Sequence, residues 1–494
     1  MSAIIANRVR SGFYLDSVAL MRLSRDIARL SGVVQSALMM ATPANKAILA
    51  DAGLLAAEGR DATANDLILA VAASTAAAAA AALSAAAAAL DRQHGATRSS
   101  QLPRPRSLRA ALRALPDASL ALISVPGEYA ADEARKALRS GLDVMIFSDN
   151  VPIAEEVALK REAEALGRLV MGPDCGTAII GGVPLAFANR VPRGDIGVIG
   201  ASGTGVQEVT SLLAAAGHGV SHAIGVGSRD LSREVGALST LTAIDLFDAD
   251  PATRRIVMIS KPPDATVARR VEARIAASRK RFTVCFLGGG EPHLSRNATA
   301  VATLRAAAED VVGVPLAAAI AGPPLPPARP GSILGLYGGG TLAAEAQLIL
   351  LAARRQVASN APVPGASAFA EAADGADRVI DLGADEFTRG RPHPMIDPAV
   401  RTPPLRAALA DAAVAVILLD VVIGTGAHPD PAGEVAAALE AAALPRPTLV
   451  ASVTGTEADP QRRSRQVATL SAAGVLVAGS NAAAAELAIA LAKV

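Results

Sequence analysis

The stretch Asp195–Glu208, DIGVIGASGTGVQE, joins the end of an expected strand to the start of an expected helix. An apolar run ends at Ile199, and the glycines that follow allow the backbone to turn tightly and to approach a ligand closely. Ser202 or Thr204 can cap the helix, whose first N–H groups favour an anion. The residues expected to bind phosphate here are Ala201, Ser202, Gly203, Thr204 and Gly205.

This turn does not fit the two common nucleotide-binding patterns. A dinucleotide fingerprint requires an acidic residue at the end of the second strand, and none stands at that distance. The chain also contains no GxxxxGKS/T loop. We therefore predict a site for phosphate or carboxylate rather than for a dinucleotide or nucleoside triphosphate. An ordinary strand-to-helix turn without a ligand is the alternative.

The region around this turn is repeated later in the chain. DIGVIGASGTGVQE corresponds to SILGLYGGGTLAAE, SHAIGVGSRD to RVIDLGADEF, RRIVMISKPPD to VAVILLDVVIGTG, and FTVCFLGGGEP to PTLVASVTGTE. Four matches in the same order predict two flavodoxin-like doubly wound sheets, each with its site at the carboxyl edge of the strands. Further phosphate-binding residues are then expected at Gly339, Gly340, Thr341, Gly424, Thr425 and Gly426.

Alternation of strand and helix patterns divides the 494 residues into four expected domains. Residues 1–90 predict a small α+β ferredoxin-like domain, and residues 108–192 predict a Rossmann-like domain of the CoA-binding type. The two flavodoxin-like domains are expected at 193–312 and 332–494. Polar and Pro-rich stretches at 91–107 and 313–331 predict linkers.

Composition excludes several classes of function. A net charge of +1 and 2% aromatic residues give no argument for nucleic acid or acidic membranes as partners. Two cysteines cannot form a disulfide framework or a CxxC metal site, so a reduced, cytoplasmic setting without a bound metal is expected. No targeting peptide is expected at the N-terminus. The uncharged stretch 67–90 predicts a strand and an Ala-rich helix, with a membrane span as the alternative.

Several strings in the chain resemble those of known enzymes. Residues 110–312, which contain MGPDCGTAI, GVGSRD and DADPATRRIVMIS, resemble the α subunit of succinyl-CoA synthetase. The last domain resembles the C-terminal domain of the β subunit of that enzyme. The chain resembles the FdrA family in three features: the fusion of these parts, the small first domain, and the string LGADEFTRGRPHPMIDP (382–398).

These resemblances imply a function. In the synthetase, two helix N-termini hold the phosphate of a phosphohistidine, and the matching turns here are 201–205 and 424–428. FdrA-type proteins are implicated in anaerobic purine and allantoin breakdown as part of oxamate carbamoyltransferase, which converts oxalurate and phosphate to oxamate and carbamoyl phosphate. The FdrA resemblance thus implies partner subunits, a carbamate kinase downstream, and no covalently bound cofactor. A homo-oligomer is an open alternative.

The chain departs from the synthetase at four points. Around His293 the flanking pattern of the phosphorylated histidine is missing, and Ser260 and Lys261 follow IVMI where a supporting glutamate is expected. The first Gly-rich loop of the CoA-binding domain and the ATP-grasp portion are absent. We interpret these departures as a phosphate site that persists without the phosphohistidine relay. Such a site suits an enzyme that uses carbamoyl phosphate or inorganic phosphate directly as its substrate.

Single residues add to this expectation. Arg391, His393 and Asp397 lie in a loop after an expected strand, where arginine can hold a carboxylate bidentately; a rigid surface turn is the alternative. Lys261 can neutralise a phosphate or be a solvated strand-end lysine. A pocket for substrate or CoA is expected at Asp174, Cys175 and Gly176, with Cys175 as a buried structural thiol rather than a nucleophile.

Three functions remain open from the sequence. The first is a subunit of a phosphate-dependent carbamoyltransferase. The second is a CoA ligase of the succinyl-CoA synthetase type without its own ATP-grasp domain, which would bind CoA along 110–190. The third is a non-catalytic scaffold or regulatory subunit.

Overall fold

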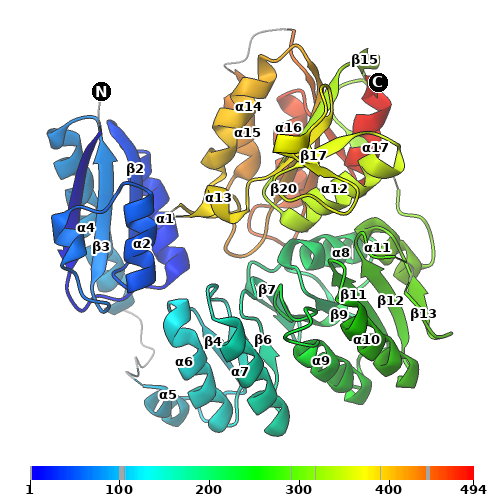
Figure 1. The fold of residues 1–494 in the computed structure, drawn as a ribbon, viewed down its shortest axis with the longest axis horizontal. Coiled ribbons are helices and arrows are strands. Elements are labelled where there is room, and N and C mark those ends of the chain that lie inside the picture. Colours follow the sequence, from blue (N-terminus) through cyan, green and yellow to red (C-terminus); the bar gives the residue numbers. More distant parts are fainter. Residues whose placement is uncertain are drawn as a thin grey trace.

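The computed structural model describes residues 3–98, 105, 107–290, 292–317, 319–389, 391–440 and 445–493. Figure 1 shows a small N-terminal domain at one side of a larger body that is built from α/β units. The sheets of that body are mostly parallel and are covered by helices, as expected where strands and helices alternate. The structure confirms the predicted α/β fold class with a small α+β domain at its start.

The N-terminal domain is a three-stranded antiparallel sheet with helices on it. Its elements are β1 (Ile4–Arg10), α1 (Ser17–Ala28), β2 (Val33–Met40), α2 (Pro43–Asp51), α3 (Ala57–Arg60), β3 (Leu67–Ala73) and α4 (Ala76–Arg98). The central strand β3 pairs antiparallel with both β1 and β2, which is the split βαβ arrangement of ferredoxin-like folds. Every residue of β3 is buried.

Residues 67–90 were expected to form either a strand followed by an Ala-rich helix or a membrane span. They form a buried strand and an Ala-rich helix, and no helix within the described ranges is both long and apolar enough to cross a membrane. The linker expected at 91–107 is wrong in its first part, because α4 continues to Arg98. Alanine is the best helix former, and its run carries the helix into the polar stretch. Residues 99–104 and 106 lie outside the described part.

The next unit is a short parallel sheet with strand order β4-β5-β6. Its elements are α5 (Leu108–Ala114), β4 (Leu120–Ile123), α6 (Gly127–Arg139), β5 (Asp143–Ile146), α7 (Ile153–Ala165) and β6 (Val170–Met171). A hairpin of β7 (Thr177–Ile180) and β8 (Val183–Ala186) follows, and β7 pairs antiparallel with a strand of the following sheet. The hairpin therefore ties this unit to the next one.

The third unit has the flavodoxin-like strand order. Its elements are β9 (Arg193–Gly200), α8 (Gly203–Ala215), β10 (Val220–Gly225), α9 (Leu238–Ala249), β11 (Arg255–Ser260), α10 (Ala265–Ala277), β12 (Arg281–Phe286), β13 (Ala298–Ala300) and α11 (Leu304–Val312). The order β10-β9-β11-β12-β13 is the 2-1-3-4-5 order of a doubly wound sheet. The topological switch point then lies between β9 and β11.

The fourth unit repeats this order with additional edge strands. Its first half contains β14 (Ile320–Ala321), β15 (Arg329–Pro330), β16 (Ser332–Tyr337), α12 (Gly340–Ala352), β17 (Val357–Ser359), β18 (Ser367–Ala368), η1 (Phe369–Glu371) and β19 (Asp377–Asp381). Its second half contains α13 (Asp385–Thr388), η2 (Pro398–Arg401), α14 (Thr402–Leu409), β20 (Val414–Val422), α15 (Pro431–Glu440), β21 (Thr448–Thr454), α16 (Arg463–Ala472), β22 (Leu476–Ala478), α17 (Asn481–Leu491) and β23 (Ala492–Lys493).

In this sheet β19-β16-β20-β21-β22 reproduces the order 2-1-3-4-5, as the sequence repeat predicts. The stretch 313–331 is more than a linker, because β14 pairs with β22 and β15 pairs with β23. The third and fourth units share one hydrophobic core, to which Val206 and Val209 of α8 and Leu342 and Ala346 of α12 contribute. The shared core places the two switch points next to each other.

Candidate functional site

The two duplicated glycine turns meet at the centre of the molecule. Ser202, the N-cap of α8, forms a hydroxyl–hydroxyl hydrogen bond with Thr341 in the first turn of α12. A Cβ atom built on Gly339 would lie 3.0 Å from Thr204 Cγ2. The turns predicted from the repeat are therefore brought together, and both helices begin there.

The turn before α8 keeps its helix-start N–H groups available. The Ala201 N–H donates to Ile259 O (3.0 Å), and the Gly205 N–H donates to Ser202 Oγ (3.4 Å). Across the described ranges, no protein atom accepts from the backbone N–H groups of residues 202–204. A Cβ atom on Gly203 would lie 2.9 Å from Thr177 Oγ1, so this position has no room for a side chain. The arrangement suits an anion at the helix start.

The turn before α12 is different, because a carboxylate of the protein occupies it. Asp420 accepts hydrogen bonds from the backbone N–H groups of Gly338 (2.7 Å) and Gly339 (2.7 Å). Arg401 donates to the same carboxylate, and both side chains are buried. Asp420 belongs to β20, in which all nine residues are buried.

A second carboxyl group and a lysine stand at the same edge. Burial raises the pKa of Asp381 to about 6, against the opposing effects of the Gly383 N–H and the positive charge of Lys261. Lys261 itself is exposed at the end of β11. Desolvation lowers the pKa of His393 to about 4, so its imidazole is neutral at pH 7, and its Nδ1 accepts from the Met395 N–H (3.2 Å). Lys261 and His393 thus lie near the predicted turns.

The turn at Asp174–Gly176 borders the site from the side of β6. A Cβ atom on Gly225 would lie 2.5 Å from Cys175 Sγ, which shows how tightly this turn packs on β10. Burial raises the pKa of Cys175 to about 12, so the thiol stays protonated at neutral pH, as a structural cysteine does. Asp174 is exposed as a residue, although the atoms packed around its carboxyl group raise its pKa to about 6.

The third predicted turn, Gly424–Gly426, already uses two of its N–H groups within the protein. The Gly424 N–H donates to Gln461 Oε1 (3.2 Å), and the Thr425 N–H donates to Ala188 O (3.1 Å). The helix α15 begins only at Pro431, beyond this turn. Gly424–Gly426 therefore contacts the strand-end segment after β8.

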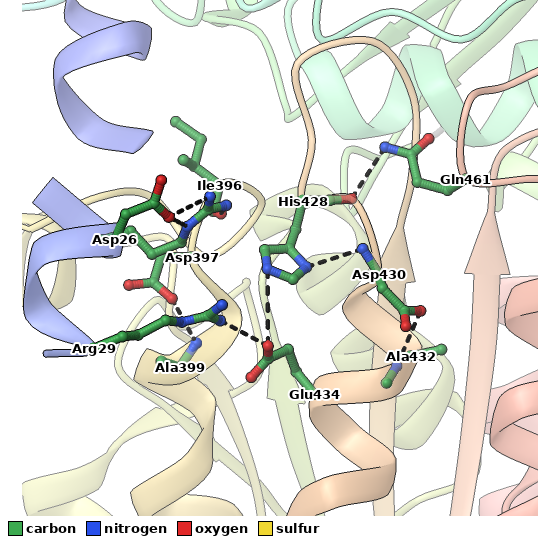
Figure 2. Close-up of polar contacts among 12 residues, drawn as sticks. Asp26, Arg29, Ile396, Asp397, Ala399, His428, Asp430, Ala432, Glu434 and Gln461 are labelled. Carbon is green, nitrogen blue, oxygen red and sulfur yellow. Dashed lines mark hydrogen bonds and ion pairs between the residues drawn. The ribbon is translucent and has the colours of Figure 1, made fainter. Parts of the chain in front are cut away.

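The N-terminal domain docks on this turn, on the segment before η2 and on α15. Arg22 donates to Gly426 O (2.9 Å), Arg25 donates to Ile396 O (3.3 Å), and Arg29 pairs with Glu434 (2.6 Å). In Figure 2, Arg29, the C-cap residue of α1, and His428 both point toward Glu434. The arginines lie on one face of α1, because their spacing of three and four residues matches one helical turn.

His428 is buried under this contact. Its Nδ1 accepts from the Asp430 N–H (3.1 Å), and its Nε2 lies 3.9 Å from Glu434 Oε1. Burial lowers the pKa of His428, and the charges of Arg25 and Arg29 lower it further. The neutral imidazole is thus a part of the domain contact, with both ring nitrogens facing protein groups.

Other predicted residues take structural positions. Arg391 is exposed, and its backbone N–H donates to Thr388 O (3.0 Å). Asp397 is the N-cap of η2 and accepts from the Ala399 N–H (3.1 Å). His293 is exposed, and its N–H donates to Glu272 on α10 (3.1 Å). In the described part of the chain, none of these three residues forms a hydrogen bond with the two glycine turns.

Behind the turns lies a buried pair of glutamates at equivalent positions of the two repeats. Glu208 of α8 accepts from the Asn481 N–H (2.9 Å), and Glu345 of α12 accepts from Asn481 Nδ2 (2.8 Å) and from the Leu304 N–H (2.6 Å). Burial raises the pKa of Glu345 to about 7, and the nearby charge of Glu208 adds to the shift. This pair connects the two helices that begin at the turns.

The raised pKa of Glu345 predicts a pH dependence of stability. Between pH 4.5 and 7 the folded state holds more protons at this group than the unfolded state does, so the free energy of unfolding falls as pH rises. The variant Glu345→Gln removes this titration. The difference in the free energy of unfolding, variant minus native chain, should therefore be about 1–3 kcal/mol more positive at pH 8 than at pH 5. Urea unfolding at both pH values measures the difference.

The exposed Glu58 provides a matched control for this measurement. Glu58→Gln should change the free energy of unfolding by less than about 0.5 kcal/mol at either pH. A Glu345→Gln difference that is the same at pH 5 and pH 8 would contradict the assignment.

The structure adds residues that the sequence analysis did not single out, namely Asp420, Arg401, Asp381 and the Glu208–Asn481–Glu345 group. A signal for Asp420 was present, since it is an acid inside the apolar run VAVILLDVV. A charge in a buried strand requires a partner. Its partner Arg401 lies on a separate element, η2.

Two family models match separate parts of the chain. A family model described as CoA-ligase matches residues 336–491, and one described as AllF, heavy metal-associated domain, matches residues 1–105. The matched residues 1–105 contain no cysteine and a single histidine, His94, and the described part of the chain holds no group of three or more His, Cys, Asp or Glu side chains that could hold a metal ion. The residues therefore do not fit a site for a soft heavy metal. The CoA-ligase match covers most of the fourth unit, which is one of the two duplicated doubly wound sheets.

The chain belongs to the FdrA family. It is 39% identical to the Escherichia coli (strain K12) protein YahF, with 96% of each chain covered. It is 28% identical to the ADP-forming sulfoacetate-CoA ligase subunit SauD of Bilophila wadsworthia (strain 3_1_6), over 38% of this chain and 65% of that protein. The apo form of the dinucleotide-forming acetyl-coenzyme A synthetase 1 of Ca. Korarchaeum cryptofilum matches with 16% identity and a TM-score of 0.30, over 76% of this chain and 83% of that chain.

Proposed function

We propose that this chain is the phosphate-binding subunit of a phosphate-dependent carbamoyltransferase that interconverts oxalurate and phosphate with oxamate and carbamoyl phosphate. The observation that carries the proposal is the turn before α8, whose N–H groups at residues 202–204 have no acceptor in the described part of the chain. Lys261 supplies a positive charge at the same edge of the sheet. Membership of the FdrA family supports the choice of reaction.

In this reaction a phosphate oxygen bonds to the carbamoyl carbon of oxalurate. The bond from that carbon to the oxamate nitrogen breaks, and the nitrogen takes up a proton. The helix start and Lys261 stabilise negative charge on the phosphate throughout. Asp381, whose pKa is raised to about 6, is a carboxyl group at this edge that can carry a proton near neutral pH.

The second candidate is a CoA ligase, which the family model over residues 336–491 favours. CoA would lie at the carboxyl edge of the β4-β5-β6 sheet. There the N-terminal domain contacts Ser124: Tyr14 Oη donates to Ser124 O (3.2 Å), and Ser17 Oγ lies 3.2 Å from Ser124 Oγ. A CoA molecule at this edge would have to share space with these side chains. We therefore place the carbamoyltransferase first, and a non-catalytic scaffold last.

The two enzyme candidates are separated by supplying both sets of substrates to one preparation. The chain is co-purified with its native partners and incubated with oxalurate and phosphate, and in parallel with ATP, CoA and a carboxylic acid such as succinate. Formation of oxamate and carbamoyl phosphate in equal amounts is the expected result. Formation of an acyl-CoA without carbamoyl phosphate would replace the proposal by the CoA ligase.

Lys261→Ala tests the role of the exposed lysine. Removing one positive charge near a bound dianion should weaken phosphate binding about five- to tenfold, because such a pair is worth roughly 1 kcal/mol near a solvated surface. Titration of the complex with inorganic phosphate measures the change. Lys136→Ala is the control, since Lys136 is an exposed lysine on α6. Equal phosphate affinities for both variants would contradict the role.

A further inference from the structure

The two duplicated turns have opposite electrostatic surroundings. The strand pairings allow the two turns to be compared position by position. In the third unit, Gly200 of β9 pairs with Ile259 of β11. In the fourth unit, Leu336 of β16 pairs with Leu419 of β20, so that the following residues, Tyr337 and Asp420, stand beside each other. Because Gly200 and Tyr337 are equivalent in the repeat, Ile259 occupies in the third unit the position that Asp420 occupies in the fourth. An apolar residue therefore stands beside one turn and a carboxylate beside the other.

The contacts of the glycines agree with this difference. Cβ atoms built on Gly203 and Gly205 would meet Thr177 Oγ1 and methyl groups of Ile259 and Thr341. On Gly339 and Gly340, by contrast, they would approach carboxylate oxygens, Asp420 Oδ2 at 3.1 Å and Asp381 Oδ2 at 2.6 Å. Glycine is required in the second turn because two carboxylates of the protein approach its backbone.

We propose that Asp420 is a built-in substitute for a bound anion at the second turn, so that each chain binds one phosphate, at the α8 turn, while Asp420 positions the α12 turn against it. This inference rests on the proposed function for the identity of the α8 ligand. Its own support is the pair of backbone hydrogen bonds from Gly338 and Gly339 together with the ion pair to Arg401.

Arg401 supplies an independent indication that the second turn is an anion site. Its side chain is 7% exposed, and its Nε has no hydrogen-bond partner in the described part of the chain. A Cβ atom on Gly338 would lie 3.4 Å from Arg401 Nη2. Removal of the Asp420 carboxylate would thus leave two N–H groups and a buried guanidinium around a space of carboxylate size, and a small anion from solution should enter it.

Asp420→Ala in the full chain tests this inference by rescue with formate. We expect the melting temperature of the variant to be lower than that of the native chain, and to rise by about 2–4 °C in 100 mM sodium formate relative to sodium chloride of the same concentration. The native chain should show no such difference. The double variant Asp420→Ala/Arg401→Met should lose the response, because the guanidinium is gone.

Phosphate stoichiometry is the second readout, with one phosphate per native chain expected. Two phosphates on the native chain, or an Asp420→Ala variant that responds equally to formate and chloride, would overturn the inference. If Asp420→Ala does not fold, Asp420→Gly is measured in the same way. A variant that is obtained in folded form only in buffers containing formate would support the inference. A formate response of the variant without phosphate binding by the native chain would uphold the role of Asp420 and refute the proposed function.

Discussion

Replacing Lys160 by methionine is expected to lower the free energy of unfolding by about 3–5 kcal/mol, because the change leaves the buried Asp230 carboxylate without its cation and leaves Glu156 paired with Arg229 alone. Lys160 Nζ donates to Glu156 (2.8 Å), to Asp230 (2.8 Å) and to Val226 O (3.0 Å), and all three charged side chains are at most 1% exposed. Methionine preserves the length of the side chain, so the loss comes from charge rather than from a cavity.

This ion cluster connects α7 of the second unit to the loop after β10 of the third. It therefore holds the Asp174–Gly176 turn next to the α8 turn. Arg161→Met is the matched control, since Arg161 is the next residue on α7 and is exposed, and it should change stability by less than about 0.5 kcal/mol. Chemical denaturation measures both variants. A Lys160→Met chain within about 1 kcal/mol of the native one would contradict this assignment of the cluster.

The second large effect is expected from Gly203→Val. A Cβ atom at this position would lie 2.9 Å from the hydroxyl of Thr177, which is itself 3% exposed, so the turn must move. Movement of the turn would take its N–H groups away from the proposed phosphate. Each hydrogen bond to a charged group is worth roughly 1.5–3 kcal/mol, and we expect phosphate affinity to fall about 10- to 100-fold. Titration with inorganic phosphate gives the affinity, and thermal melting shows whether the fold persists.

Gly290→Ala is the control for this change, because a Cβ atom there meets no atom within 4 Å. It should leave phosphate affinity unchanged. A folded Gly203→Val variant that binds phosphate as tightly as the native chain, in a complex of unchanged activity, would favour a scaffold role over the proposed one.

The repeat in the sequence was sufficient to predict most of the fold. The matched strings became β9 and β16, β10 and β19, β11 and β20, and β12 and β21, in sheets with the same strand order. Local patterns could specify these elements because apolar runs and Gly-rich turns depend on nearby residues. The helical end of α4 and the pairing of β14 and β15 were not predicted, since both lie in polar or Pro-rich stretches.

The site was predictable only in part, because its residues are joined by long-range contacts. The turn at Gly424–Gly426 has the same local pattern as the others, but Ala188 and Gln461 accept from two of its N–H groups. Likewise, nothing local connects Asp420 to Gly338, which lies 82 residues away in the chain. The contact of Arg22 with Gly426 spans 404 residues and depends on how whole domains dock.

The central claim is that the α8 turn holds the phosphate during carbamoyl transfer. It is tested most directly by measuring phosphate release from carbamoyl phosphate, with and without oxamate, in complexes assembled with native partners from the native chain and from Gly203→Val. We predict release that depends on oxamate in the native complex and is lost in the variant. No oxamate-dependent release from an intact native complex would contradict the proposed carbamoyl transfer and would favour the CoA ligase.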